Sequence, residues 1–222
     1  MRFSVIIPTL AEASTIAGAV TSAGRAFPGC EVVVADGGSD DGTDRVAAAA
    51  GATVVHAPGT KAAAMNRAAA LATGDALVFL HADTRLPSGA AEAVSDALAG
   101  GAGIGCFRVR FDRPRPLLER LISVRSTLFG VAYGDQALFV SADAFVRCGG
   151  FRPIPIMEDF DLVRRLRRQG GLAVLPAAVT TSGRRHRQSG RARTLVRIWL
   201  IQLLYLLRVP PERLAWLYPP VR

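Results

Sequence analysis

The sequence predicts an α/β fold built on a mostly parallel, doubly wound sheet. Over the first hundred residues, short β-branched apolar runs alternate with Ala-rich stretches of helical period, which is typical of successive βαβ units. Runs such as residues 32–34 are apolar throughout, as strands buried on both faces require. The length of 222 residues and the hydrophobic fraction of 50% fit one domain with an appendage.

Each expected strand of the first half is followed by an expected helix. The strands are Phe3–Ile7, Glu31–Ala35, Thr53–His56 and Ala76–Leu80. The helices lie near residues 13–25, 43–50, 60–72 and 88–99. The order of the elements therefore favours parallel pairing of all four strands.

From about residue 103 this alternation stops. The pattern then predicts a strand at Ile104–Phe111 that leads into Pro114-Arg115-Pro116, and a helix that follows these residues through Phe129. A strand at Ala137–Val140, a short helix from Ser141, a loop at Gly149–Ile156 and a helix at about 158–169 come next. A basic segment at 183–190 precedes the apolar stretch Ile198–Leu207, and Pro210-Pro211 begins a last short helix. Ten apolar residues are too few to span a bilayer, which takes about 20.

The net charge of +9 is distributed unevenly. Residues 1–110 carry 8 basic and 10 acidic side chains (−2), whereas residues 111–222 carry 19 and 8 (+11). The two halves are therefore expected to face different partners. Lys61 is the only lysine among 27 basic residues, so we give the overall basicity little weight. Three cysteines without C-x-x-C spacing indicate neither a zinc site nor a disulfide framework, and the start of the chain lacks a leader pattern, which favours the cytoplasm.

Polar clusters follow three of the expected strands. They are Pro8–Glu12, Asp36–Thr43 and His81–Thr84. Ligands of open parallel sheets bind beyond the carboxyl ends of the strands, so these clusters are expected to form one site. Taken singly, each also fits an ordinary turn or a helix cap. No G-x-G-x-x-G or Walker loop occurs, so a diphosphate would need another counter-charge, from Lys61, Arg67 or a divalent ion held by Asp83.

As an ordered set, these segments resemble the inverting family-2 glycosyltransferases of GT-A fold, which use nucleotide-sugar donors. The resemblance covers roughly residues 1–190 and rests on Ser4–Thr9 with Glu12, Val34–Thr43, Gly59–Asn66 with Gly74-Asp75, Phe79–Asp83, Gly134–Gln136 and Met157–Asp159. The chain looks most like a small bacterial subgroup without large membrane spans.

The resemblance implies a single GT-A domain over residues 1–190. A Rossmann-like, nucleotide-sugar-binding half covers 1–102, an acceptor half covers 103–190, and a helical tail covers 191–222. The implied donor is a UDP-sugar, with Asp36 accepting from the N3–H of the base. The donor-binding positions that carry over are Pro8, Thr9, Glu12, Asp36, Gly38, Ser39, Lys61, Asn66, Ala82, Arg184 and Arg185.

The resemblance also implies a divalent cation, Mn²⁺ or Mg²⁺. Asp83 corresponds to the last Asp of the family's D-x-D element, and His81 replaces the first Asp. An imidazole either coordinates Mn²⁺ or supports Asp83 from the side. The loss of one carboxylate is expected to lower the affinity for a hard cation.

Asp159 is the implied catalytic base, with Glu158 as the neighbour that shares its task. Inversion needs a carboxylate to take the proton of the acceptor hydroxyl as it attacks. Alternatively, two acids at a helix start cap it and favour its dipole. Gly134–Gln136 is expected to open an acceptor-side strand, and Asp135 and Gln136 are expected to bind the acceptor. Asp161 is interpreted as a helix-face ion pair with Arg164 and Arg165, and His56 and His186 as structural.

The apolar stretch of the tail is flanked by Arg193, Arg197 and Arg208 and contains Trp199 and Tyr205. This pattern fits an interfacial helix on the inner face of the cell membrane, which would suit a lipid-linked or apolar acceptor. It fits equally a helix that packs on the domain or on a second subunit.

The alternatives to a glycosyltransferase are a nucleotidyltransferase, a module that binds an anionic surface and a degenerate relative. The sequence does not support a nucleotidyltransferase. Enzymes of that class have an early Gly-rich phosphate loop followed by Arg and Lys, and this chain has none. A module for nucleic acid or another anionic surface would explain the charge, but acidic clusters crowd the expected sheet edge, so no nucleic-acid partner is expected. A degenerate relative that binds a sugar nucleotide without turnover remains an alternative because of His81.

Overall fold

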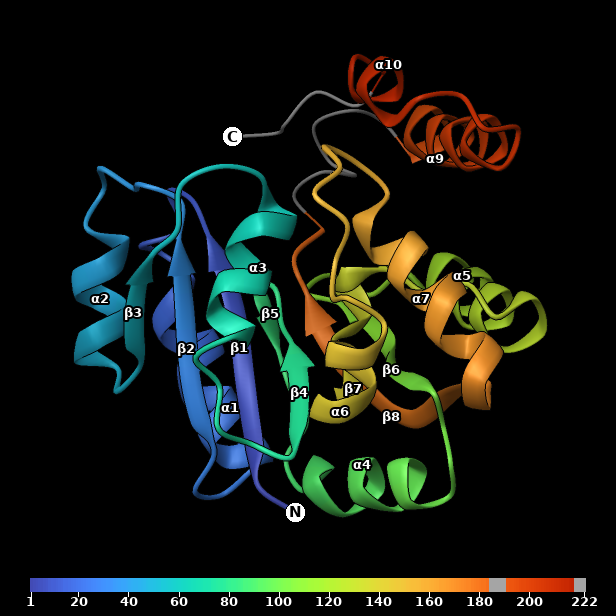
Figure 1. Cartoon of the computed structure of the whole chain (residues 1–222). Coiled ribbons are helices and arrows are strands. Elements are labelled where there is room, and N and C mark those ends of the chain that lie inside the picture. The colour runs from blue at the N-terminus through green and yellow to red at the C-terminus, as the bar shows by residue number, and fades with distance from the viewer. Residues whose placement is uncertain (184–190, 218–222) are drawn as a thin grey trace.

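The computed structural model describes residues 1–183 and 191–217, with side chains of 191–196 left aside. Its strands form one eight-stranded sheet in the order β3-β2-β1-β4-β7-β6-β8-β5 (Figure 1). The strands are β1 Phe3–Thr9, β2 Glu31–Asp36, β3 Thr53–His56, β4 Ala76–Phe79, β5 Thr84–Arg85, β6 Ile104–Phe111, β7 Leu138–Ser141 and β8 Leu172–Thr181. The helices are α1 Ile16–Ala26, α2 Thr43–Ala49, α3 Lys61–Ala69, α4 Ala90–Ala99, α5 Pro116–Phe129, α6 Ala142–Arg147, α7 Glu158–Gly170, α9 Arg191–Leu206 and α10 Pro211–Ala215.

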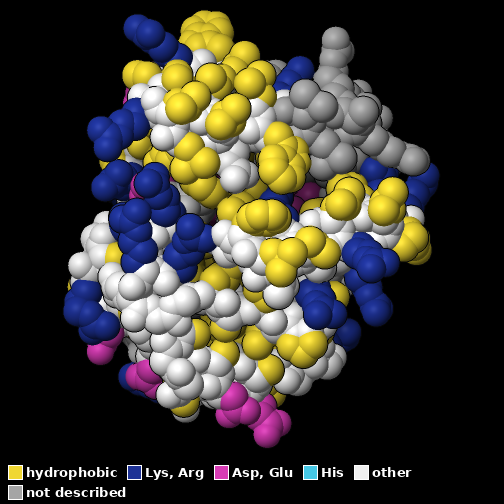
Figure 2. Space-filling model, turned by 90° about the vertical axis from the view of Figure 1, so that its right-hand side faces the viewer, with side chains coloured by type: hydrophobic (Ala, Val, Ile, Leu, Met, Phe, Trp, Pro, Cys, Tyr) yellow, Lys and Arg dark blue, Asp and Glu magenta, His cyan; other side chains and the backbone are white. Residues whose placement is uncertain are grey.

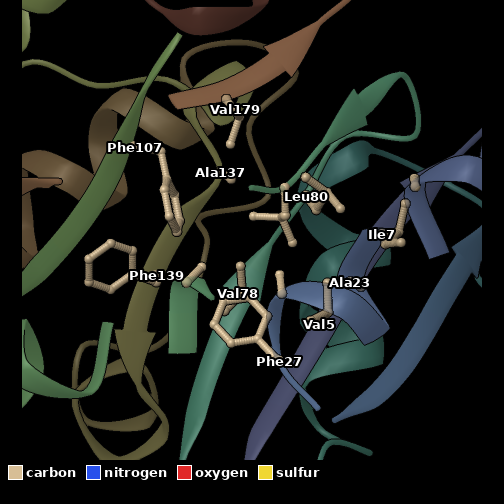
Figure 3. Packing of buried hydrophobic residues seen from close by; sticks show 14 of the residues in the cluster. Val5, Ile7, Ala23, Phe27, Val78, Leu80, Phe107, Ala137, Phe139 and Val179 are labelled. Atoms are coloured by element: carbon tan, nitrogen blue, oxygen red, sulfur yellow. The ribbon is translucent and has the colours of Figure 1, made fainter. Parts of the chain in front are cut away.

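The first four strands confirm the predicted parallel sheet. β1 pairs in parallel with both β2 and β4, and β2 pairs in parallel with β3. Successive side chains along these strands point to opposite faces of the sheet and so enter two separate cores. Val5 and Ile7 pack toward α1, as Figure 3 shows, whereas Ile6 packs toward α3 and α7. All three are fully buried, which is why the strands read as unbroken apolar runs.

The second half of the sheet departs from the prediction in two places. β8 is a ten-residue strand that the sequence analysis missed, and it pairs in parallel with β6 and antiparallel with the short β5. Gly134–Gln136 was expected to open a strand, but it forms the 3-10 turn η1 ahead of β7. Ala137 follows this turn with a φ of 49°, so the extended backbone of β7 begins only at Leu138.

The tail packs on the domain as helices α9 and α10. Ile201 and Leu214 join Val131, Met157 and Phe160 in a small third core. Tyr205 donates a hydrogen bond to Asp161 in α7 (3.1 Å), so a polar contact also fixes the tail. No helix among the described residues is long and apolar enough to cross a bilayer. In Figure 1 the tail lies at the end of the molecule where β1, β2 and β4 have their carboxyl ends.

Candidate active site

The carboxyl ends of β1 and β2 bring Thr9 and Asp36 together. The two residues are paired in the parallel register, and Thr9 Oγ1 donates to Asp36 Oδ1 at 3.1 Å. The backbone N–H groups of Gly38 and Ser39 and the Ser39 hydroxyl also donate to this carboxylate. Burial acts to raise the pKa of Asp36, but these donors outweigh it, so the pKa lies below its ordinary value.

Further side chains of the β2–α2 loop hold the loop that follows β1. Ser39 Oγ accepts from the N–H of Ala11 (2.9 Å), and Thr43 Oγ1 accepts from the N–H of Glu12 (2.9 Å). The predicted donor residues Glu12, Ser39 and Asp36 therefore belong to one hydrogen-bonded wall. Pro8 is partly exposed at the end of β1 beside this wall.

We expect Asp36→Asn to weaken the hydrogen bonds that hold the ends of β1 and β2 together. The Asn amide nitrogen cannot accept a hydrogen bond, so buried donors lose a partner, at a cost of about 1–3 kcal/mol in the free energy of unfolding. Thermal unfolding would report that loss, and titration with UDP should show weaker binding. Asp40→Asn is the matched control, since Asp40 is an exposed carboxylate of the same loop. Equal nucleotide affinity in both variants would contradict a role for Asp36 in the donor site.

A cluster of charged side chains lies where α3, α7 and the end of β4 meet. Lys61 Nζ is 2.9 Å from Glu158 Oε1, 2.9 Å from Asp159 Oδ2 and 3.0 Å from His81 Nε2. The N–H of Gly134 donates to the same oxygen of Asp159 at 3.0 Å. Residues far apart in the sequence thus converge on Asp159. We call these five residues the Lys61 cluster.

Within the Lys61 cluster, the pKa values of the two carboxylates shift in opposite directions. Burial acts to raise the pKa of Asp159, but the charge of Lys61 and the hydrogen bonds from Lys61 and Gly134 outweigh it and lower the pKa. Burial and the neighbouring Asp159 raise the pKa of Glu158, against the opposing charge of Lys61. Burial acts to lower the pKa of Lys61, yet both carboxylates together raise it. Asp159 is therefore the carboxylate held ionised at neutral pH.

Gly134 was named in the sequence only as part of a motif, and the structure gives it a specific task. A Cβ at this position would lie 2.6 Å from Asp159 Oδ2 and also collide with His81 Nε2. Only glycine lets the backbone N–H approach the carboxylate so closely. The requirement for glycine comes from contacts with residues 25 or more positions away in the sequence, so sequence patterns alone did not indicate it.

The predicted metal residues His81 and Asp83 lie in the turn between β4 and β5. An ammonium group can only donate, so the lone pair of His81 Nε2 is used by Lys61. Asp83 supplies carboxylate oxygens, the donors that Mg²⁺ and Mn²⁺ favour. No group of three or more His, Cys, Asp or Glu side chains suited to a metal occurs in the described parts of the chain. The donor set fits a cation held by Asp83 and by substrate phosphates better than one held by protein ligands alone.

The predicted acceptor residues Asp135 and Gln136 have different surroundings. Gln136 is fully buried, donates to the carbonyl of Phe107 (3.1 Å) and accepts from Arg125 (3.1 Å), so its side-chain amide serves the fold. Asp135 Oδ1 is buried and has no hydrogen-bond partner among the described residues. Burial raises the pKa of Asp135, Arg125 opposes the shift, and Asp159 adds to it.

Two predicted nucleotide contacts are occupied elsewhere in the fold. Both ends of the Asn66 amide bond to the backbone of Phe151, at 2.7 and 2.9 Å, so Asn66 pins the loop that leads to α7. Arg67 donates to the carbonyl of His56 at the end of β3. Ala82 is buried in the β4–β5 turn. Contacts of these residues with a nucleotide stay predictions.

Of the two ion pairs predicted for Asp161, the one with Arg165 is confirmed, at 2.7 Å, whereas none with Arg164 occurs among the described residues. Asp161 also pairs with Arg152 and accepts from Tyr205, so it is a buried junction of α7, the preceding loop and α9. Arg184, Arg185 and His186 lie outside the described residues.

The family of this chain is shown by a comparison with models of protein families. A model of glycosyl transferase family 2 matches residues 4–155, more than half of the chain. The chain belongs to this family. The match begins in β1 and ends just before α7. It therefore contains Asp36 with its hydrogen-bond partners, Lys61 and the β4–β5 turn. A comparison with curated protein sequences gives no significant match.

Solved structures of glycosyltransferases share the fold of this family 2 member. The mannosyltransferase PcManGT from Pyrobaculum calidifontis, in complex with GDP-Man and Mn²⁺, has a TM-score of 0.72 and 23% identity, covering 97% of this chain and 68% of that one. S. aureus TarS 1–349 with UDP-GlcNAc has a TM-score of 0.62 and 20% identity, covering 83% and 59%. Glucosyl-3-phosphoglycerate synthase from Mycobacterium tuberculosis, with Mn²⁺, UDP and glucosyl-3-phosphoglycerate, has a TM-score of 0.56 and 23% identity, covering 79% and 70%. The chain thus spans about 60% of the TarS 1–349 structure.

Proposed function

We propose that the protein is an inverting glycosyltransferase that moves a sugar from a UDP-sugar to a hydroxyl group. The observation that carries the proposal is the Lys61 cluster, in which Asp159 is kept ionised beside the carboxyl ends of the parallel strands. An ionised, buried carboxylate at the ligand-binding edge of such a sheet is suited to proton abstraction. The solved structures similar in fold, described above, hold UDP, UDP-GlcNAc or GDP-Man.

The chemistry follows from the position of Asp159. Its carboxylate takes the proton of the acceptor hydroxyl, whose oxygen forms the new bond to the anomeric carbon. On the opposite face, the bond from that carbon to the diphosphate oxygen breaks, and the nucleoside diphosphate leaves with the electron pair. Asp135, whose buried Oδ1 has no hydrogen-bond partner in the described parts of the chain, is suited to orient the acceptor hydroxyl. Lys61 keeps its positive charge beside Asp159 and Glu158, and so holds Asp159 in its ionised form.

A divalent cation fits this scheme through Asp83. When bound, Mn²⁺ or Mg²⁺ would offset the negative charge that develops on the leaving diphosphate. Asp83 would hold it from the protein side, and His81 would stay with Lys61. Two of the solved structures named above contain Mn²⁺.

The test is a calorimetric titration with UDP, and with GDP as comparator, in Mn²⁺ and in EDTA. We expect UDP to bind more tightly than GDP, and Mn²⁺ to strengthen binding by about tenfold or more, since Asp83 would hold a cation whose charge offsets that of the phosphates. Asp83→Ala should remove the effect of Mn²⁺ while leaving the weaker metal-free binding. Equal binding in Mn²⁺ and EDTA would contradict the metal assignment. Binding without turnover of any UDP-sugar would instead favour a degenerate member of the family.

A further inference from the structure

Helix α5 has apolar side chains on two opposite faces. On its inner face, Ile122 packs into the core on the side of the sheet that α1 covers. On its outer face Leu117, Leu121, Val124 and Leu128 are spaced four, three and four residues apart and form a single exposed stripe. A helix that only covers the sheet needs one apolar face, so the packing of the domain does not explain this outer stripe.

Helices α9 and α10 repeat this arrangement in the tail. Ile201 and Leu214 point into the third core, whereas the opposite side exposes apolar side chains to solvent. The exposed ones are Trp199, Leu200, Leu203, Leu206, Leu207, Trp216 and Leu217. Trp216 is 89% exposed. The tail therefore shields a core with one side and leaves an apolar surface on the other.

Together these side chains and Phe129 at the end of α5 form what we call the apolar face. It contains 12 of the 16 exposed large hydrophobic residues of the described chain. In Figure 2 hydrophobic side chains gather over the upper and middle parts of the molecule on this side. Concentration of this kind, rather than scattered single residues, marks a surface that contacts a partner.

The charge around the apolar face is positive. Arg113, Arg120, Arg208 and Arg213 are exposed beside it, and Lys and Arg side chains border the hydrophobic area in Figure 2. The one acidic residue of α5, Glu119, accepts from backbone N–H groups of Phe111 and Arg115. The sequence of α9 has no acidic residue, and α10 adds Glu212 next to Arg213.

We propose that the apolar face docks on the surface of an anionic lipid bilayer. A second copy of the chain is a poorer occupant, because a two-fold contact would bring together two surfaces that are both bordered by arginines. Anionic headgroups attract those arginines, while Leu, Phe and Trp side chains enter the boundary of the acyl chains. The face combines α5 of the domain with the tail, so the docked orientation is fixed by two elements rather than by the tail alone.

This orientation would place the bilayer close to the Lys61 cluster. Tyr205 of α9 bonds to Asp161, two residues beyond Asp159, and Tyr133, next to Gly134, bonds to Gln202 of α9 at 3.0 Å. A membrane-borne hydroxyl acceptor would then be within reach of the site. This last step rests on the proposed function, whereas the docking itself does not.

The experiment is flotation of the full chain with phosphatidylcholine vesicles that contain or lack phosphatidylglycerol, without donor or acceptor. We expect binding only to the anionic vesicles, weakened by high salt. The chain's only two tryptophans, Trp199 and Trp216, lie on the apolar face, so their emission should shift to the blue on binding. The double variant Leu121→Asp, Leu128→Asp should reduce partitioning by at least about tenfold, since it removes apolar contact and adds repulsion.

Leu71→Asp and Val146→Asp are the matched controls, because both residues are exposed leucine or valine side chains outside the apolar face. They should bind vesicles as the unchanged protein does. Unchanged partitioning of the double variant would overturn the proposal, as would equal binding to neutral vesicles. A lipid-free dimer in sedimentation velocity that the double variant dissociates would assign the face to a second copy instead. Nucleotide binding of the double variant should be unchanged, which separates this test from that of the proposed function.

Discussion

Asp159→Asn should lower kcat by about a hundredfold to ten-thousandfold, the range that a general base contributes. The amide can still accept from the N–H of Gly134, so the local backbone should keep its shape. It cannot take a proton from the acceptor hydroxyl. Nucleotide affinity, measured by calorimetry, should therefore remain close to that of the unchanged protein while transfer is lost.

Glu158→Gln is the matched comparison for Asp159→Asn. Both carboxylates contact Lys61 at the same distance of 2.9 Å, but only Asp159 bonds to Gly134 and has a lowered pKa. We expect Glu158→Gln to retain most of the transfer activity. If Glu158→Gln abolished transfer and Asp159→Asn did not, the two roles would have to be exchanged.

Lys61→Met should reduce both activity and stability. It removes the cation shared by two carboxylates and leaves them next to each other. Removal of one partner from a buried ion pair costs about 3–5 kcal/mol, and since the Lys61 side chain is 34% exposed we expect a smaller loss in the free energy of unfolding. Without the cation the pKa of Asp159 should rise, so the acidic limb of the kcat/KM profile should move to higher pH.

The pH dependence of stability gives a second readout for Lys61→Met. A carboxylate with a lowered pKa stabilises the fold above its unfolded pKa, and this contribution is lost on acidification. In the variant, protonation of one carboxylate relieves their repulsion, so the stability difference from the unchanged protein should be larger at pH 8 than at pH 5. Lys61→Arg keeps the charge and should recover most of the stability. An equal difference at both pH values would show that the ion pairs are not its cause.

The sequence predicts the nucleotide-binding half of the fold well because its strands are buried on both faces. Val5, Ile6 and Ile7 must all be apolar under those conditions, and such runs are easy to recognise. β8 was missed because Pro176 interrupts its apolar pattern. The structure accommodates this proline at a shift in register, where Phe107 pairs with Leu175 and Arg108 with Ala178.

The candidate site could be located from the sequence, but its internal contacts could not. Polar residues after parallel strands identify the edge where Asp36 and His81 lie. That Lys61 contacts Asp159 depends on how α3 and α7 pack, and these two residues are 98 positions apart. For the same reason the sequence did not show that the fold uses the amides of Asn66 and Gln136 in internal hydrogen bonds.

The position of Lys61 also determines how the protein reacts with amine-directed reagents. The chain carries one lysine, and its ammonium is held by two carboxylates that raise its pKa and keep it protonated. Acylating reagents attack only the free amine, so the folded protein should react with them more slowly at Lys61 than an unpaired lysine would. Protection of Lys61 against such a reagent therefore reports whether its two ion pairs are intact.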